Sequence, residues 1–332
     1  MMDQLSNYDK YPVVKVSGCT DGCWQGWEDI GVEINRYISG YTKPVKKVVI
    51  ECYPGVLDKE LVEALSVALG DEYFFFSSDA MLSQQEINDF FSEDITTDEV
   101  FGYLTRHTID KFFDPKKVSE LRKQISAVKE GVISIYGTGA AYICPDADVL
   151  IYADMPRWEI QQRFRRNEIS NLGIENRNER PSLQYKRSFF VDWRVCDRFK
   201  KTIMDRWDYL LDTTLLGSPK MVTGENIRRG LQKALTTPFR VVPFFDPGPW
   251  GGQWMKKVIG LDESVPNYAW CFDCVPEENS LLLGFGDMTI EIPSVNLVFA
   301  YPRDLLGVPV YGRFGDEFPI RFDFLDTIGE ET

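Results

Sequence analysis

Short apolar runs alternate with helical patterns through the first two thirds of the chain, and this alternation restricts the fold more than any other feature. Five runs have the length and composition of buried parallel strands: residues 13–16, 47–52, 72–77, 131–136 and 148–153. Between them, two stretches place apolar residues on one helical stripe: Leu61, Val62, Leu65 and Leu69, then Val118, Leu121, Ile125 and Val128. Strands and helices that alternate in this way predict an α/β fold with a parallel sheet.

The pattern changes after residues 216–219, where Leu-Gly-Ser-Pro marks a boundary. A helix is expected over residues 224–235, and beyond Pro238 short strands broken by Pro and Gly dominate. We expect these strands at residues 239–245, 280–285, 288–292, 295–300 and 319–325. The sequence therefore predicts an α/β domain over residues 1–217, a helical connector over 218–236, and a mostly β segment of sandwich or jelly-roll type over 237–332.

The net charge of −14, from 37 Lys and Arg against 51 Asp and Glu, repels phosphate backbones and anionic lipids. Nucleic acid and membranes are therefore not expected as partners. The sequence begins without a basic stretch followed by an apolar run, and it contains no uncharged apolar stretch long enough to span a bilayer. These features predict a cytoplasmic protein.

Cysteine and histidine usage limits the chemistry of the chain. Seven cysteines spread over 332 residues indicate reduced thiols rather than a disulfide framework. Cys271 and Cys274 have CxxC spacing, but strand-like alternation directs them to opposite faces, which favours buried structural cysteines. His107 is the single histidine, so a histidine pair or an HExxH metal site is excluded. We expect His107 to have a structural or surface role.

A glycine-rich loop follows the first apolar run. Residues 17–26 include Gly18 and Gly22, which are candidates for binding phosphate through the backbone. However, no Gly-Lys-Ser/Thr follows, and Asp21 adds a negative charge where phosphates would lie. A structural turn and a weak anion site both remain open for this loop.

Residues 137–141, 147–156 and 163–166 resemble the late strand and arginine-bearing helix of P-loop kinase folds of the uridine-kinase and nucleoside-monophosphate-kinase type. This resemblance implies a P-loop-kinase-like parallel sheet and makes a nucleotide a candidate ligand. Arg163 and Arg166 lie three apart on one helix face and are candidates for clamping a phosphate. The alternative is a solvated face that pairs with neighbouring glutamates. A divergent kinase would need Lys15 or an arginine in place of the missing loop lysine.

Residues 237–254 contain the turn Trp250-Gly251-Gly252 and resemble the entry of class I mannose-6-phosphate isomerases. Two glycines beside an aromatic ring allow backbone N–H groups to approach an anion while the ring packs on a sugar. The match continues through residues 276–283, 305–307 and 313–326, and it resembles a two-part bacterial form with an α/β segment ahead of the cupin. Trp250, Gly251 and Gly252 are therefore the candidate substrate-binding residues.

This resemblance implies a partial cupin, a sugar-phosphate ligand, and interconversion of mannose 6-phosphate and fructose 6-phosphate with zinc as cofactor. In the family a Gln-x-His pair follows the strand equivalent to residues 319–325, whereas this sequence continues only to Thr332. No metal ligand or catalytic residue is therefore assigned, and we expect a shortened family member that binds no stoichiometric zinc. An unfinished barrel would expose strand edges that favour pairing between copies of the chain. The alternative function is non-catalytic binding of a sugar phosphate or a nucleotide.

Overall fold

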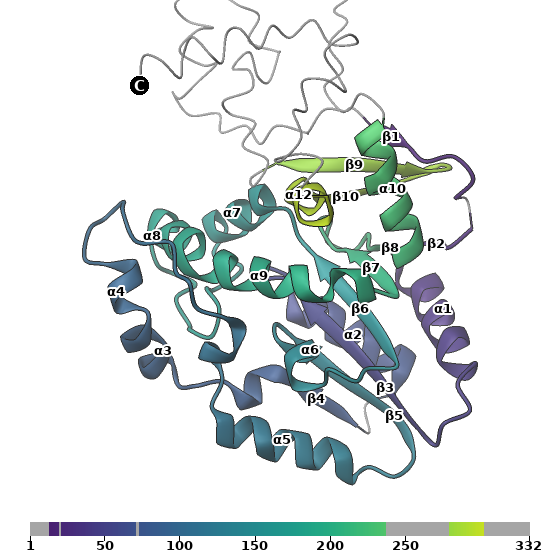
Figure 1. The fold of residues 1–332 in the computed structure, drawn as a ribbon, viewed down its shortest axis with the longest axis horizontal. Helices are drawn as coiled ribbons and strands as arrows, with labels where there is room; N and C mark the ends of the chain where they lie inside the picture. Colours follow the sequence, from purple (N-terminus) through teal and green to yellow (C-terminus); the bar gives the residue numbers. More distant parts are fainter. Residues whose placement is uncertain (1–12, 20, 71–72, 237–278, 302–332) are drawn as a thin grey trace, which may run out of the picture.

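A computed structural model describes residues 13–19, 21–70, 73–236 and 279–301. Over these residues the protein has an α/β fold, which confirms that part of the prediction (Figure 1). The predicted substrate-binding turn at residues 250–252, the Cys271/Cys274 pair and most of the predicted cupin segment lie outside the described residues.

The main sheet has seven strands in the order β2-β8-β7-β6-β3-β5-β4. Their bounds are β2 (Cys23–Gln25), β3 (Val45–Cys52), β4 (Phe74–Phe76), β5 (Gly131–Gly137), β6 (Val149–Asp154), β7 (Tyr209–Asp212) and β8 (Lys220–Thr223). The strands from β7 to β4 are parallel, and β8 and β2 extend the sheet in antiparallel register. The central strand β3 carries Val48, Val49 and Ile50 without exposure to solvent, as expected of a strand covered on both faces.

Helices cover both faces of this sheet (Figure 1). On one face lie α1 (Trp27–Ser39) and α2 (Asp58–Leu69), which pack closely enough that a Cβ on Gly31 would meet the Ala68 methyl at 2.9 Å. Figure 1 shows α5 (Pro115–Ala127), α6 (Ala140–Ile143) and α9 (Trp193–Ile203) on the near face. Asp114 caps α5 by accepting the Lys116 and Lys117 N–H groups, and Pro115 begins its first turn.

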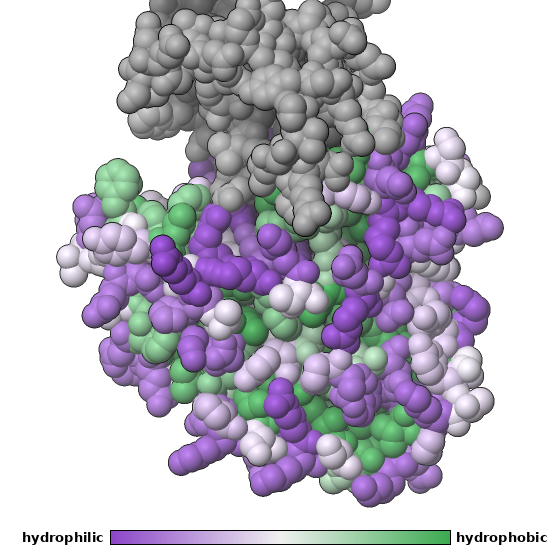
Figure 2. Space-filling model, in the orientation of Figure 1, coloured by the Kyte–Doolittle hydropathy of each residue, from purple (hydrophilic) through white to green (hydrophobic). Residues whose placement is uncertain are grey.

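The remaining helices lie toward the ends of the sheet and in its connections. Their bounds are α3 (Gln84–Phe90), α4 (Ser92–Ile95), α7 (Arg157–Arg165), α8 (Pro181–Arg187), α10 (Gly224–Thr236) and α12 (Val295–Ala300). The face shown in Figure 2 is largely hydrophilic with small apolar patches. Among the described residues, no helix is long and apolar enough to cross a membrane.

A second sheet of three strands has the order β1-β9-β10, formed by β1 (Val13–Lys15), β9 (Ser280–Phe285) and β10 (Met288–Pro293). The first predicted strand is therefore confirmed as a strand, but it pairs in parallel with β9 and lies outside the main sheet. The predicted strand at residues 295–300 is wrong, because these residues form α12. Here tertiary contacts override β propensity: the Asn296 side chain is buried in a polar network.

That network joins α12 to the main sheet. The Lys200 ammonium donates to both carboxylate oxygens of Asp154 and to Asn296 Oδ1, each at 2.8 Å, and Asn296 Nδ2 donates to Asp154 at 2.7 Å. The side chains of Lys200 and Asp154 are 0% exposed. Because the hydrogen-bonding groups of the three side chains pair with one another, the charges of Lys200 and Asp154 can be buried without water.

The α/β unit also extends beyond the predicted boundary at residue 217. The predicted connector, residues 218–236, contains β8, which pairs with β7 in the main sheet, and α10, which packs on β1, β7 and β8. The Gly224 N–H donates to the Asp208 carbonyl at 2.7 Å, which ties the start of α10 to the sheet. Both elements are therefore integral parts of the fold.

We expect Lys200→Met to destabilise the protein by about 3–5 kcal/mol, because it leaves the Asp154 carboxylate buried without a cation. The control is Lys123→Met on α5, where the side chain is 72% exposed and its loss should change stability by about 0.5 kcal/mol or less. Chemical denaturation of both variants measures the difference. Equal stabilities of the two variants would mean that the buried network does not hold α12 against the main sheet.

Candidate functional site

A polar cleft of about 1080 Å³ lies at the carboxyl ends of β3, β4 and β5. Its walls are formed by residues 52–60, by residues 76–78 and 136–138, which follow β4 and β5, and by residues 167–175. In open parallel sheets, ligands bind outside the carboxyl ends of the strands, where neighbouring connections diverge. Here the connection after β3 leads to β4 on one side, whereas the connection after β5 leads back past β3 to β6 on the other side. The cleft therefore lies where the two connections diverge.

The loop between β3 and α2 forms one end of the cleft. Gly55 has φ +100°, and a Cβ there would meet the Ile160 side chain at 2.7 Å, so only glycine fits this turn. The N-cap of α2 is Leu57, which supplies no side-chain cap to the first-turn N–H groups. Lys59 follows in the first turn, with its side chain 87% exposed. The sequence analysis missed this strand-loop-helix junction, although Gly55 and Lys59 directly after an apolar run were a usable signal.

Acidic residues outnumber basic ones along the cleft, but most of them have partners. The Asp58 carboxylate accepts the Tyr136 hydroxyl at 2.7 Å. Glu60 accepts the Trp27 indole N–H at 3.2 Å and the Gly217 N–H at 2.8 Å. Glu63 lies 3.9 Å from the Lys59 ammonium in a weak exposed pair. Lys59 is therefore well placed to turn toward a ligand at the start of α2.

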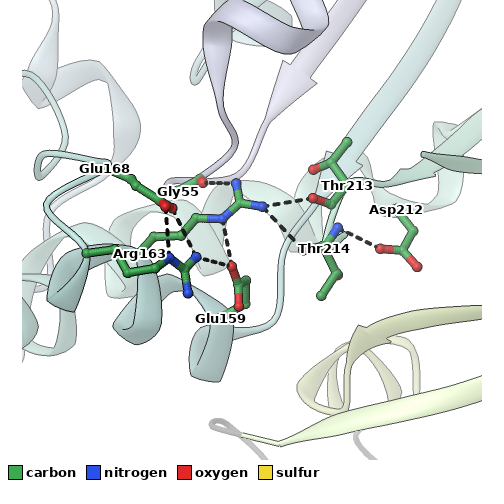
Figure 3. Close-up of polar contacts among 8 residues, drawn as sticks. Gly55, Glu159, Arg163, Glu168, Asp212, Thr213 and Thr214 are labelled. Atoms are coloured by element: carbon green, nitrogen blue, oxygen red, sulfur yellow. Dashed lines mark hydrogen bonds and ion pairs between the residues drawn. The ribbon is translucent and has the colours of Figure 1, made fainter. Parts of the chain in front are cut away.

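Arg163, a predicted phosphate clamp, is buried behind the cleft and is 1% exposed. Figure 3 shows its guanidinium donating to the carbonyls of Gly55 at 2.8 Å and Thr213 at 2.9 Å, with a longer contact to Thr214 at 3.4 Å. Its Nε donates to Glu159 at 3.1 Å. The side chain thus connects the loop after β3 to the loop after β7, and it does not face a ligand.

Arg166 lies at the end of α7 and pairs with two carboxylates, Glu159 at 2.7 Å and Glu168 at 2.8 Å. This matches the alternative interpretation of a solvated, paired face. The hydrogen bonds to Glu168 and Glu159 raise the pKa of Arg166 further above its usual range, so the side chain stays cationic.

Gly18 and Gly22 lie apart from these arginines, in the segment between β1 and β2. Gly22 packs against Thr223 and Asn226, and its carbonyl accepts the Thr223 N–H at 3.0 Å. The structure therefore does not bring the four predicted phosphate-binding residues into one site.

The described cysteines, Cys19, Cys23, Cys52, Cys144 and Cys196, are free thiols. The His107 ring packs against Phe90 in a tilted arrangement, with 4.7 Å between ring centroids. Within the described ranges, no group of three or more His, Cys, Asp or Glu side chains is arranged to hold a metal ion.

Glu51 is buried beneath the cleft, at the end of β3. Its two carboxylate oxygens accept the Gly139 and Ala141 N–H groups, both at 2.7 Å, and so position the turn that follows β5. Thr138 in the same turn lines the cleft and donates to the Cys52 carbonyl at 2.8 Å. Burial raises the pKa of the Glu51 carboxyl to about 8, although the two N–H donors favour the ionised form.

One family model matches the chain: a domain of unknown function (DUF8485), over residues 26–236. The match runs from the start of α1 to the end of α10 and includes every wall of the cleft. No curated protein matches this sequence.

We expect the free energy of unfolding to fall as the pH rises from about 4.5 to about 8, because unfolded Glu51 loses its proton in this range while folded Glu51 keeps it. The contribution is about 1.4 kcal/mol per pH unit between these two pKa values. Chemical denaturation at several pH values should show this slope. Glu51→Gln should make the slope shallower by this contribution, because the buried carboxyls of Glu291, Asp212 and Asp192, whose pKa values are also raised, keep the rest of it. Glu120→Gln, on the exposed side of α5, serves as the control that keeps the slope. An unchanged slope in Glu51→Gln would contradict the assignment.

Proposed function

We propose that this chain, which belongs to the family described as a domain of unknown function (DUF8485), binds a sugar phosphate in the cleft at the carboxyl ends of β3, β4 and β5. The position and size of the cleft are the observation that carries the proposal. Its volume is in the range of small-molecule sites, and the strand order places it where α/β sheets bind ligands.

The two ends of the cleft suit the two parts of such a ligand. The start of α2 offers backbone N–H groups without a side-chain cap, together with the exposed Lys59 ammonium, and both favour a phosphate. Hydroxyl and backbone groups at Ser77, Ser78 and Thr138 line the opposite wall and can hydrogen-bond to sugar hydroxyls.

The choice of a sugar as the phosphorylated compound rests on the resemblance of residues 237–332 to mannose-6-phosphate isomerases. A nucleotide is less well supported. Asp58 and Glu60 stand beside Lys59, where a P-loop has glycine and Ser/Thr, so the first turn of α2 cannot bind a triphosphate with magnesium in the P-loop manner. We therefore propose that the chain shares the architecture and ancestry of P-loop kinases and that it does not transfer phosphoryl groups.

Isomerisation of mannose 6-phosphate to fructose 6-phosphate is the second candidate function. Trp250, Gly251 and Gly252 favour it through the family resemblance, and they lie outside the described residues. Zinc would act in this reaction as a Lewis acid. Zinc analysis of the purified chain and a coupled assay for the interconversion test it directly, and turnover with about one zinc per chain would establish this function.

The binding proposal predicts that mannose 6-phosphate binds saturably by isothermal titration calorimetry and that mannose binds at least about tenfold more weakly. Lys59→Ala should weaken binding of mannose 6-phosphate by about tenfold, because it removes the cation at the start of α2. Lys123→Ala, on the exposed face of α5, is the matched control and should leave the affinity unchanged. Equal affinities for mannose and mannose 6-phosphate, or for Lys59→Ala and the unmodified chain, would refute the proposal.

A further inference from the structure

A second pocket, of about 440 Å³, lies between the end of β1 and α10, on residues that the cleft does not use. It is lined by Val16, Ser17, Arg229, Gln232 and Lys233. Every polar side chain in this set carries a hydrogen-bond donor: a hydroxyl, a guanidinium, an amide and an ammonium. None of the lining residues that the structure describes is acidic, in contrast to the cleft and to a protein with a net charge of −14.

The two cations come from one face of α10. Arg229 and Lys233 are four residues apart, so they lie one turn from each other and both border the same pocket. Among the described residues, Glu225 lies a further turn back and pairs with Arg229 Nη2 at 2.6 Å. Its side chain is 67% exposed, so this pair is weak and can open for a ligand.

Cys19 helps to position Arg229. Arg229 Nη1 lies 3.6 Å from the Cys19 sulfur, and Cys19 is buried. The Arg229 side chain is 53% exposed, and its guanidinium contacts both the β1–β2 segment and Glu225. This arrangement lowers the conformational entropy that a ligand must overcome when it engages the arginine.

Gly18 follows Ser17, which lines the pocket. Gly18 has φ +71°, and a Cβ added there would have no atom within 4 Å. A turn with this conformation, next to Ser17, lets an anion approach the main chain closely. The glycine-rich loop of the sequence analysis thus lies beside two cations that are more than two hundred residues away in the chain.

We propose that this pocket is a second binding site, specific for the phosphate group of a small molecule. Arg229 and Lys233 bind the phosphate oxygens, and Ser17 and Gln232 donate further hydrogen bonds. The same chemistry fits inorganic phosphate and a phosphorylated sugar, and the volume leaves room for the larger of the two. The site is independent of the cleft, and each can exist without the other.

Isothermal titration calorimetry on the full chain tests the proposal, with inorganic phosphate and mannose 6-phosphate as separate probes. The Lys59→Ala variant weakens the cleft by about tenfold, and binding that is then lost when Arg229 and Lys233 are also replaced is assigned to the pocket. In that background we expect saturable binding of at least one probe, and Arg229→Gln/Lys233→Gln should weaken it by about tenfold or more. Arg228→Gln removes the same charge from another face of α10 and should change the affinity by less than about twofold.

The outcomes separate the two sites. Binding of both probes assigns the pocket to phosphate itself, whereas binding of mannose 6-phosphate alone assigns it to the phosphorylated sugar. If the Lys59→Ala variant binds neither probe, or if the double variant binds as tightly as Arg228→Gln, the pocket proposal is overturned. The proposed function would still stand in that case if the unmodified chain binds mannose 6-phosphate. Circular dichroism of the double variant confirms that the chain is folded, as expected for exposed side chains.

Discussion

The buried guanidinium of Arg163 is the contact on which the geometry of the site depends. It bridges the carbonyls of Gly55 and Thr213, which follow β3 and β7, across the intervening strand β6. An unpaired cation in this position would be very costly, and Glu159 on the same helix compensates its charge. Because Glu159 also pairs with Arg166, one carboxylate connects the buried contact to the protein surface. The loop that precedes α2 is therefore held at a fixed distance from the loop that follows β7.

Polar contacts of the same kind hold the small sheet against the main one. The Asp212 carboxylate, at the end of β7, accepts the Glu291 N–H of β10 at 2.8 Å. The Trp158 indole N–H donates to Glu291 at 2.6 Å, and the Lys200–Asp154–Asn296 network closes the junction. Such contacts are directional, so they specify one arrangement of the two sheets where an apolar seam would tolerate several. The small sheet is therefore part of the same cooperative structure.

The sequence predicted the elements better than their partners. The strands at 47–52, 131–136 and 148–153 were clear because buried parallel strands are continuous apolar runs, and the stripe from Leu61 to Leu69 marked α2. The sheet to which the first strand belongs was not predictable, because its partner β9 lies almost at the other end of the described chain. Without that pairing, the glycine-rich loop after β1 seemed to occupy the position that the loop after β3 holds in the main sheet.

Site residues were harder to predict for the same reason. Arg163 and Arg166 have the residue type and spacing of a phosphate clamp. However, the partners of Arg163 are backbone carbonyls, which every residue carries, so the sequence does not reveal them. Arg229 and Lys233 look like ordinary residues of an amphipathic helix, and only the packing of α10 on β1 places them beside Gly18. A charged side chain acquires its role from the groups that the fold brings to it.

The parallel pairing of Val13 with Leu282 also has a consequence for how the chain folds. All seven strands of the main sheet lie within residues 23–223, so they can begin to pair during synthesis before β9 is made. Strand β1, although made first, must wait for β9, and closing so long a loop slows the last step. Until then the first strand remains an unpaired edge, and a chaperone or a second copy can compete for it.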